Sequence, residues 1–117
     1  MKVLVCGGRG FADRAAVFRA LDGLHAKHGI RRIIHGAATG ADALASEWAR
    51  ERGVPQIGYP AAWEQGRKAG PLRNQHMLDS QEPDCVIAFP GGSGTADMVR
   101  RAEAAGVRVW KPVFPQP

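Results

Sequence analysis

Cysteine is scarce in this sequence, which has only two, Cys6 and Cys85, among its 117 residues. Each lies inside a short apolar run of the kind that forms a buried strand. Two isolated thiols make neither a disulfide framework nor a zinc site with four ligands. We therefore expect two small core residues in a reducing compartment, no metal site and no cofactor.

Long apolar runs are also absent. No segment approaches the roughly 20 residues that span a bilayer, and no charged and then apolar leader precedes the first predicted strand. The sequence therefore predicts a cytoplasmic protein without a membrane partner. Its length is that of one domain, and its 44% hydrophobic and 23% charged residues are ordinary for a globular fold.

Aromatic residues make up only 7% of the chain, and no continuous basic run is present although the formal net charge is +5. The arginines are spread along predicted helices instead of forming one cluster. Binding of single-stranded nucleic acid requires a continuous positive groove with exposed aromatic side chains. The positive charge thus favours an anionic ligand in general, and nucleic acid is the least favoured class of partner.

Short apolar runs alternate with helical patterns along the whole chain. The predicted strands are residues 2–6, 30–35, 54–59, 84–89 and 107–110. Asp13 is a typical N-cap for the first helix, and Gly70 with Pro71 opens a later one. Thr39 and Asp42 have the spacing of a capping box before the second helix.

This alternation predicts an α/β fold, a Rossmann-like three-layer sandwich with a mostly parallel sheet of five strands. Residues 1–117 are expected to form one domain, with a proline-rich extended tail at residues 111–117. The least regular segment is residues 60–69.

Three glycine-rich loops, residues 7–10, 36–40 and 90–95, follow predicted strands and lead into helices. In an open parallel sheet, ligands bind outside the carboxyl ends of the strands. Backbone N–H groups and the dipole at a helix start attract phosphate, and glycine lets a ligand approach the main chain. None of the three loops is a dinucleotide fingerprint or a Walker A loop, but together they predict a phosphate-binding cleft.

The candidate ligand-binding residues lie in these loops and on the helix that follows Gly70. They are Gly7, Gly8, Arg9, Gly36, Ala38, Thr39, Gly40, Asp42, Arg73, Asn74, Pro90, Gly91, Gly92, Ser93, Gly94 and Thr95. Arg73 is the strongest candidate, because a guanidinium group can hold a phosphate through two hydrogen bonds. Arg9 is a second phosphate candidate, and Asn74 can hydrogen-bond a ribose or a base edge. Thr39 and Thr95 are expected to cap helices and can contact phosphate as well.

Three side chains allow more than one interpretation. Asp42 either binds a ribose hydroxyl or completes the capping box. His35 ends a predicted strand, where it either transfers a proton or, as is commoner, packs with both ring nitrogens satisfied. Trp63 lies in the irregular segment and either stacks on a base, closes the cleft or only packs.

Four segments carry a resemblance to known proteins. They are GGRGF, HGAATGAD, AGPLRNQHM and PGGSGT, at residues 7–11, 35–42, 69–77 and 90–95. As a set they resemble the YpsA-related branch of the SLOG superfamily. PGGSGT is similar to the PGGxGTxxE motif of the LONELY GUY phosphoribohydrolases, often labelled lysine decarboxylase-like, and HGAATGAD to a loop of DprA-type proteins. Arg73, with Asn74 and Met77, resembles the arginine-bearing helix that such proteins place against the PGGSGT loop.

One departure from that motif bears on catalysis. The motif glutamate, taken to act on the glycosidic bond, is replaced here by Met98. Asp97 lies one residue earlier, which is a turn of about 100° around a helix. It is the candidate catalytic residue only if the protein is a hydrolase, and otherwise it is expected to be an ordinary acid in the first helical turn.

The resemblance implies a domain that binds or senses a nucleotide or nucleotide-derived ligand, including molecules related to NAD or ADP-ribose. The missing glutamate favours binding without chemistry. The alternatives are an N-glycosidic hydrolase of nucleoside monophosphates and, last, a single-stranded nucleic-acid binder. Because related proteins often pair, a homodimer is expected.

Overall fold

The computed structural model describes residues 1–112, and the tail predicted at residues 111–117 lies outside the described residues from 113 onward. The strands are β1 (Lys2–Cys6), β2 (Arg32–His35), β3 (Gln56–Gly58), β4 (Cys85–Ala88) and β5 (Arg108–Trp110). The helices are α1 (Arg14–His28), α2 (Ala41–Arg52), α3 (Ala69–Gln81) and α4 (Ser93–Ala104). A short 3-10 helix, η1 (Trp63–Lys68), occupies most of the segment predicted to be irregular.

The five strands form one sheet in the order β3-β2-β1-β4-β5, and every neighbouring pair is parallel. The predicted α/β fold is therefore confirmed, and the sheet is wholly parallel. The chain moves outward from β1 through β2 to β3 and then crosses to β4 on the other side of β1. This reversal opens a crevice at the ends of β1 and β4, because the loops that follow them lead to opposite faces of the sheet, and in such sheets ligands commonly bind there.

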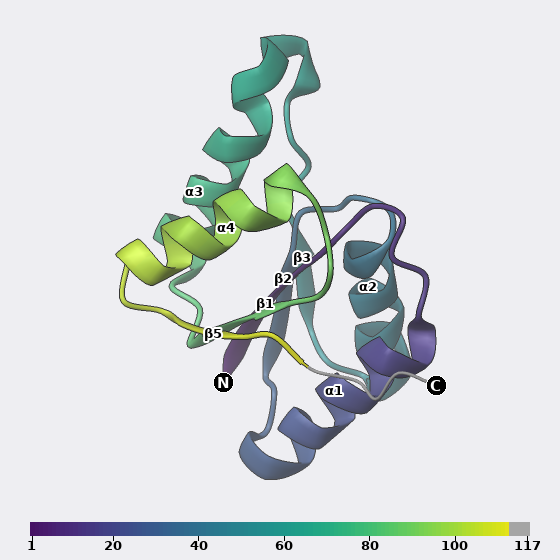
Figure 1. The fold of residues 1–117 in the computed structure, drawn as a ribbon. Coiled ribbons are helices and arrows are strands. Elements are labelled where there is room, and N and C mark those ends of the chain that lie inside the picture. The colour runs from purple at the N-terminus through teal and green to yellow at the C-terminus, as the bar shows by residue number, and fades with distance from the viewer. Residues whose placement is uncertain (113–117) are drawn as a thin grey trace.

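Helices cover both faces of the sheet, as expected when parallel strands are apolar on both sides (Figure 1). Val3 and Val5 belong to the core cluster under α1 and α2, whereas Leu4 and Cys6 belong to the cluster under α3 and α4. Trp48 is wholly buried in the first cluster, as its position in the stripe of α2 predicts. Successive side chains of β1 thus point to opposite faces of the sheet, so this strand contributes to both core clusters.

The helix ends follow their sequence signals in part. The side chain of Asp13 caps α1 by accepting a hydrogen bond from the backbone N–H of Ala16 at 3.0 Å. Pro71 is the third residue of α3, where its missing N–H costs no helical hydrogen bond. In the described residues no helix is long and apolar enough to cross a membrane. Within the same part of the chain, no group of three or more His, Cys, Asp or Glu side chains is placed to hold a metal ion.

The predicted capping box at α2 is wrong. The N-cap is Gly40, and no side chain makes a capping hydrogen bond there. Thr39 instead donates its hydroxyl hydrogen to the backbone oxygen of Arg9 at 3.2 Å. Asp42 points back into the preceding loop instead of toward a cap, because Ala37 and Gly40 have φ angles of 56° and 74° and fold that loop over the helix start.

Candidate ligand-binding site

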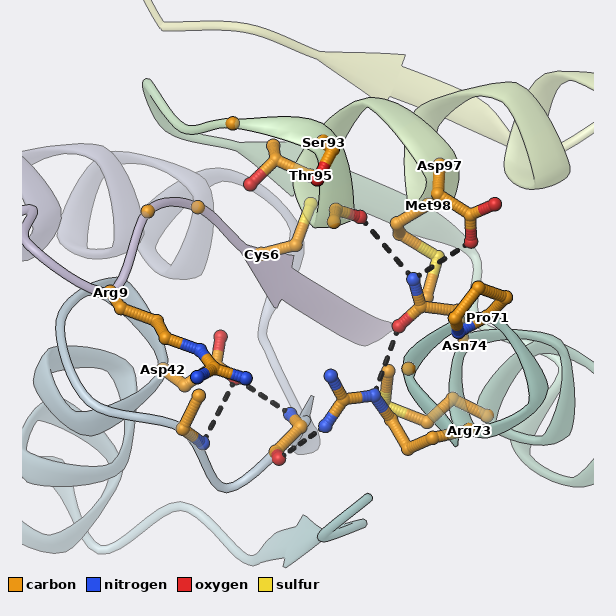
Figure 2. A pocket seen from close by; sticks show the side chains of 18 of the residues that line it. Cys6, Arg9, Asp42, Pro71, Arg73, Asn74, Ser93, Thr95, Asp97 and Met98 are labelled. Atoms are coloured by element: carbon orange, nitrogen blue, oxygen red, sulfur yellow. Dashed lines mark hydrogen bonds between the residues drawn. The ribbon is translucent and has the colours of Figure 1, made fainter. Parts of the chain in front are cut away.

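A cavity of about 660 Å³ lies where the loops after β1, β2 and β4 meet the first turns of α3 (Figure 2). Its volume is within the range of small-molecule sites, roughly 300–1,000 Å³. The sequence-predicted residues that line it are Gly7, Gly8, Arg9, Gly36, Ala38, Asp42, Arg73, Asn74, Gly92, Ser93, Gly94, Thr95 and Asp97. The three glycine loops therefore converge on one cavity.

Four predicted site residues do not line this cavity. Gly40 lies beneath the first loop, where a Cβ atom would be 2.1 Å from the backbone oxygen of Gly8. Thr39 is exposed beside it. Pro90 and Gly91 face a second, smaller cavity of about 440 Å³ on the other side of the α4 start. These four residues therefore support or flank the glycine-rich loops and do not line the cavity.

Sequence reasoning missed part of the lining. The floor of the cavity is apolar and includes Cys6, Met77 and Met98. Gly70 also lines it, one turn before Arg73 and two turns before Met77 on α3. This helical spacing is visible in the sequence and could have revealed the cavity-facing side of α3. In η1, the sequence already marks Trp63 as a candidate for the cleft, and only the tertiary structure adds Arg67 to the lining.

Arg73 reaches across the cavity to the loop after β2. Its Nη1 donates to the backbone oxygen of Gly36 at 2.5 Å and to that of Tyr59 at 3.1 Å, and its Nε donates to Asn74 Oδ1 at 3.0 Å. A Cβ atom on Gly36 would lie 2.4 Å from Nη1, so only glycine admits the guanidinium here. Of the three guanidinium nitrogens of Arg73, Nη2 is the one without a hydrogen-bond partner among the described residues.

The positive charge of Arg73 lies in an unfavourable electrostatic environment. Burial lowers the pKa of its guanidinium, the nearby Arg9 charge lowers it further, and only Asp42 acts in the opposite direction. Within residues 1–112, Arg73 forms no ion pair with a carboxylate. Figure 2 shows Arg9 and Arg73 extending toward one another from opposite sides of the cavity. Two cations facing one another in this way favour an anion between them.

Asp42 organises the loop after β2. It is 7% exposed, and its Oδ2 accepts from the backbone N–H groups of Gly36 at 3.0 Å and Ala38 at 3.2 Å. Burial raises the pKa of its carboxyl group, although these N–H groups and the charge of Arg73 oppose the shift. The carboxylate therefore fixes the loop in the shape that receives Arg73, and a ribose contact stays a prediction.

His35 is a packed residue with both ring nitrogens engaged. Nδ1 accepts from the backbone N–H of Ala37 at 3.0 Å, and Nε2 lies 2.9 Å from Gln56 Oε1. Because Nδ1 is an acceptor, Nε2 carries the hydrogen and donates it to Gln56. His35 does not line the cavity. The structure supports the packing interpretation over proton transfer.

A polar network joins α3 to α4 at the cavity wall. Buried Asn74 donates through Nδ2 to Asp97 Oδ2 at 3.0 Å and to the backbone oxygen of Gly94 at 3.3 Å. Arg101 Nε donates to the same Asp97 oxygen at 2.8 Å, and Arg100 lies 3.6 Å from the other oxygen. Asp97 is in the second turn of α4, so its assignment to the first turn is wrong.

The N-terminus of α4 is open toward the cavity. Its N-cap is Gly92 without a side-chain cap, so the expected capping by Thr95 is wrong. Ala96 makes the first backbone bond, to the oxygen of Gly92 at 3.1 Å. The described contacts provide no acceptor for the N–H groups of Ser93, Gly94 and Thr95. These three groups and the helix dipole give the cavity wall a partial positive charge.

Comparison with known proteins assigns the chain to a family. Residues 1–66, more than half of the sequence, match the YspA, cpYpsA-related SLOG family. The chain belongs to this family. It is also similar to the Gene 61 protein of Mycobacterium phage D29, with 40% identity over 92% of this chain and 93% of the phage protein.

The SLOG fold is matched by a solved structure, that of DNA processing protein A (DprA) from Streptococcus pneumoniae. The TM-score is 0.52 and the identity 19%, over 92% of this chain. This chain spans 57% of the DprA chain, and the likeness shows the fold alone. The family match over residues 1–66 confirms the resemblance to the YpsA-related SLOG branch that the sequence predicts.

In this SLOG domain, the Cys6 thiol at the cavity floor is expected to be inert. Burial, with a smaller contribution from the Asp42 charge, raises the pKa of Cys6 to about 12. Near pH 8 its thiolate fraction is then about a thousandth of that of an ordinary thiol. A C85S variant should therefore react with iodoacetamide about 1,000-fold more slowly when native than in urea. Equal rates, followed by mass spectrometry, would contradict this burial.

Asp97 of the SLOG domain should stabilise the fold in a pH-dependent way. Burial acts to raise its pKa, but the hydrogen bonds from Asn74 and Arg101 and the charges of Arg101 and Arg100 outweigh it and lower the pKa. Ionised Asp97 thus stabilises the fold above the ordinary carboxyl pKa, and this contribution is lost as the pH falls through the lowered value. Asp97→Asn should cost about 1–2 kcal/mol near neutral pH and less in acid.

Urea unfolding near pH 7 and at about pH 3 measures this difference. Asp79→Asn is the matched control, because Asp79 is exposed on α3 and accepts only from Gln75. The control should change little at either pH. An equal loss for Asp97→Asn at both pH values would contradict the assigned role.

Proposed function

We propose that this SLOG domain binds a phosphate-bearing nucleotide or nucleotide derivative, of the class of AMP and ADP-ribose, in the cavity at the ends of β1 and β4. The observation that carries the proposal is the convergence of Arg9 and Arg73 on a cavity wall made by the open N-terminus of α4. Half-buried Arg73 has no carboxylate partner among the described residues. A phosphate would give Arg73 a direct anionic partner, which the nearby Asp42 carboxylate does not provide.

The phosphate would contact groups from three segments that are distant in sequence. Arg73 offers Nη2, Arg9 offers its whole guanidinium group, and residues 93–95 offer backbone N–H groups. Helix N-termini and arginine forks are the usual phosphate ligands in such sheets. The loops are held together before binding, because Gly8 donates its backbone N–H to the oxygen of Pro90 at 2.8 Å. A preformed site avoids the entropy cost of ordering loops.

The rest of the cavity fits the non-phosphate part of such a ligand. Its floor of Cys6, Met77 and Met98 is apolar and suits a ring. Asn74 stands beside this floor, but its amide is already engaged with Arg73 and Asp97. We therefore assign Asn74 the role of positioning both residues in addition to any contact with ribose.

A second candidate function, hydrolysis of an N-glycosidic bond, is favoured by one observation. Asp97 lines the cavity, and its lowered pKa keeps it ionised, as needed to stabilise an oxocarbenium-like ribose. Two facts favour binding instead. Met98 occupies the position of the motif glutamate and is 1% exposed, and Asp97 Oδ2 already accepts two hydrogen bonds.

Calorimetric titration with AMP, ADP-ribose and NAD, followed by mass spectrometry of the recovered ligand, tests the proposal. Binding with the ligand recovered intact is the expected result. Recovery of free base and ribose phosphate would establish the hydrolase instead. DprA is by its name a DNA processing protein. Binding of single-stranded DNA alone, with affinity falling steeply as salt rises, would replace the nucleotide proposal with nucleic-acid binding.

A further inference from the structure

The geometry points to Trp63 as the base-binding platform of the cavity, on which an aromatic nucleobase stacks in place of the Arg9 guanidinium. This inference rests on the proposed nucleotide function and names the part of the ligand that gives affinity beyond the phosphate. Trp63 lines the cavity and is 52% exposed, although it is one of the largest apolar side chains in the protein. An open indole face beside arginines is a typical nucleotide contact.

The indole is held in place at one edge. It packs against Gly70 in the first turn of α3, where a Cβ atom would lie 3.4 Å from Trp63 Cη2 and 3.8 Å from Cζ3. Gly70 is buried by this contact, whereas Trp63 is not. Figure 1 shows η1 and the start of α3 extending beyond the carboxyl edge of the sheet. The ring is thus held above the loops without being enclosed in the core.

The Arg9 guanidinium occupies the place that a base would take. Its carbon lies 4.8 Å from the centroid of the Trp63 ring. Stacked aromatic rings have centroids about 4.5–7 Å apart, so a base cannot stack on this face while Arg9 remains there. Arg9 is exposed and makes no ion pair among the described residues, and a cation–π contact at an exposed site is weak. A base can therefore displace it.

Once a base has displaced it from Trp63, Arg9 can contact the phosphate in the same cavity. Arg9 and Arg73 extend toward one another across the cavity (Figure 2), so an Arg9 guanidinium that leaves the indole and moves toward Arg73 would share one phosphate with it. The ligand then makes two gains in one step, because the base covers Trp63 and the phosphate pairs with Arg9. A phosphate without a base makes only the second contact. Base and phosphate are therefore expected to bind more tightly as one molecule.

Titrations with AMP and with ribose 5-phosphate test this inference on the full chain and three variants. AMP should bind roughly 5- to 100-fold more tightly than ribose 5-phosphate. Trp63→Ala should remove most of this difference by weakening AMP binding, because the base loses its stacking partner and ribose 5-phosphate has no base to stack. Trp63→Phe should retain most of the affinity for AMP, because a phenyl ring also stacks. Trp110→Phe, a change at the other exposed tryptophan, on edge strand β5, should have no effect.

Tryptophan fluorescence gives a second readout that loss of folding would not imitate. AMP should quench the emission of the unmodified protein and of Trp110→Phe, but not that of Trp63→Phe. Equal affinities for AMP and ribose 5-phosphate would overturn the platform and leave the phosphate site standing. Tighter AMP binding that Trp63→Ala does not weaken would overturn it as well. Binding of neither compound would overturn the proposed function, and the inference with it.

Discussion

Replacing Arg73 with alanine is expected to weaken the binding of AMP or ADP-ribose by roughly 10- to 150-fold, the usual effect of losing charged hydrogen bonds. The physical reason is the position of its guanidinium group, half buried and without a carboxylate partner in residues 1–112. Arg9 alone cannot replace it, because Arg9 approaches from the opposite side of the cavity. Calorimetric titration measures the loss directly.

Two further variants separate binding from folding. Arg73→Ala also removes hydrogen bonds to the backbone oxygens of Gly36 and Tyr59, so its thermal stability must be measured beside its affinity. Arg73→Lys retains the charge but not the fork and should bind with intermediate affinity. Arg19→Ala is the matched control, because Arg19 is exposed on α1 and does not line the cavity. An Arg73→Ala protein that is folded and binds normally would refute the proposed site.

Replacing Gly40 with alanine should lower the free energy of unfolding by about 3 kcal/mol or more. Gly40 has φ 74° and ψ −128°, a conformation that is essentially confined to glycine. A Cβ atom would also lie 2.1 Å from the oxygen of Gly8 and 2.6 Å from that of Arg9. Both contacts are with backbone, so the clash cannot be relieved by rotating a side chain. The first and second glycine loops must move apart.

Gly53→Ala is the control for this substitution. Gly53 ends α2 with φ 67°, but a Cβ atom there would meet nothing within 4 Å. It should therefore show only the cost of the left-handed conformation, about 1 kcal/mol. Urea unfolding followed by circular dichroism compares the two variants, and nucleotide titration of Gly40→Ala reports the moved loops. Equal losses in the two variants would show that the close contact at Gly40 is readily relieved.

The fold was largely predictable from local sequence. Apolar runs alternate with helical patterns, and glycine follows β1 and β2 directly, so the order of elements and the converging loops were clear. Asp13 could be identified as a cap because an N-cap contacts the helix only three residues ahead. The four segments that carry the SLOG resemblance are also short, each covering one loop, one stretch of helix or one junction between a loop and its neighbouring elements. Local signals suffice where the interacting groups are close in the chain.

Two of the predictions that proved wrong failed because of contacts between residues that are distant in sequence. Thr39 and Asp42 have capping spacing, but the hydroxyl finds the Arg9 carbonyl, 30 residues away. Gly40 was a candidate phosphate contact, yet its lack of a side chain serves the packing of two loops. Asp97 was assigned to the first turn because Thr95 was expected to cap α4, whereas the helix begins at Ser93 after the N-cap Gly92. For Thr39 and Gly40, a partner distant in sequence decided the geometry.

The sequence by itself determined the parallel α/β fold, the family and the edge of the sheet where the loops gather. The fold and the sheet edge follow from apolar periodicity and from glycine at strand ends, which act within a few residues. The family follows from the resemblance of four short segments to known proteins. Only the tertiary structure decided that Arg73 spans 37 residues to Gly36, and that Trp63 and Arg9 meet above the cavity. Such contacts depend on how α3 and η1 pack over the sheet edge, and no local pattern encodes a distance between segments that the fold alone brings together.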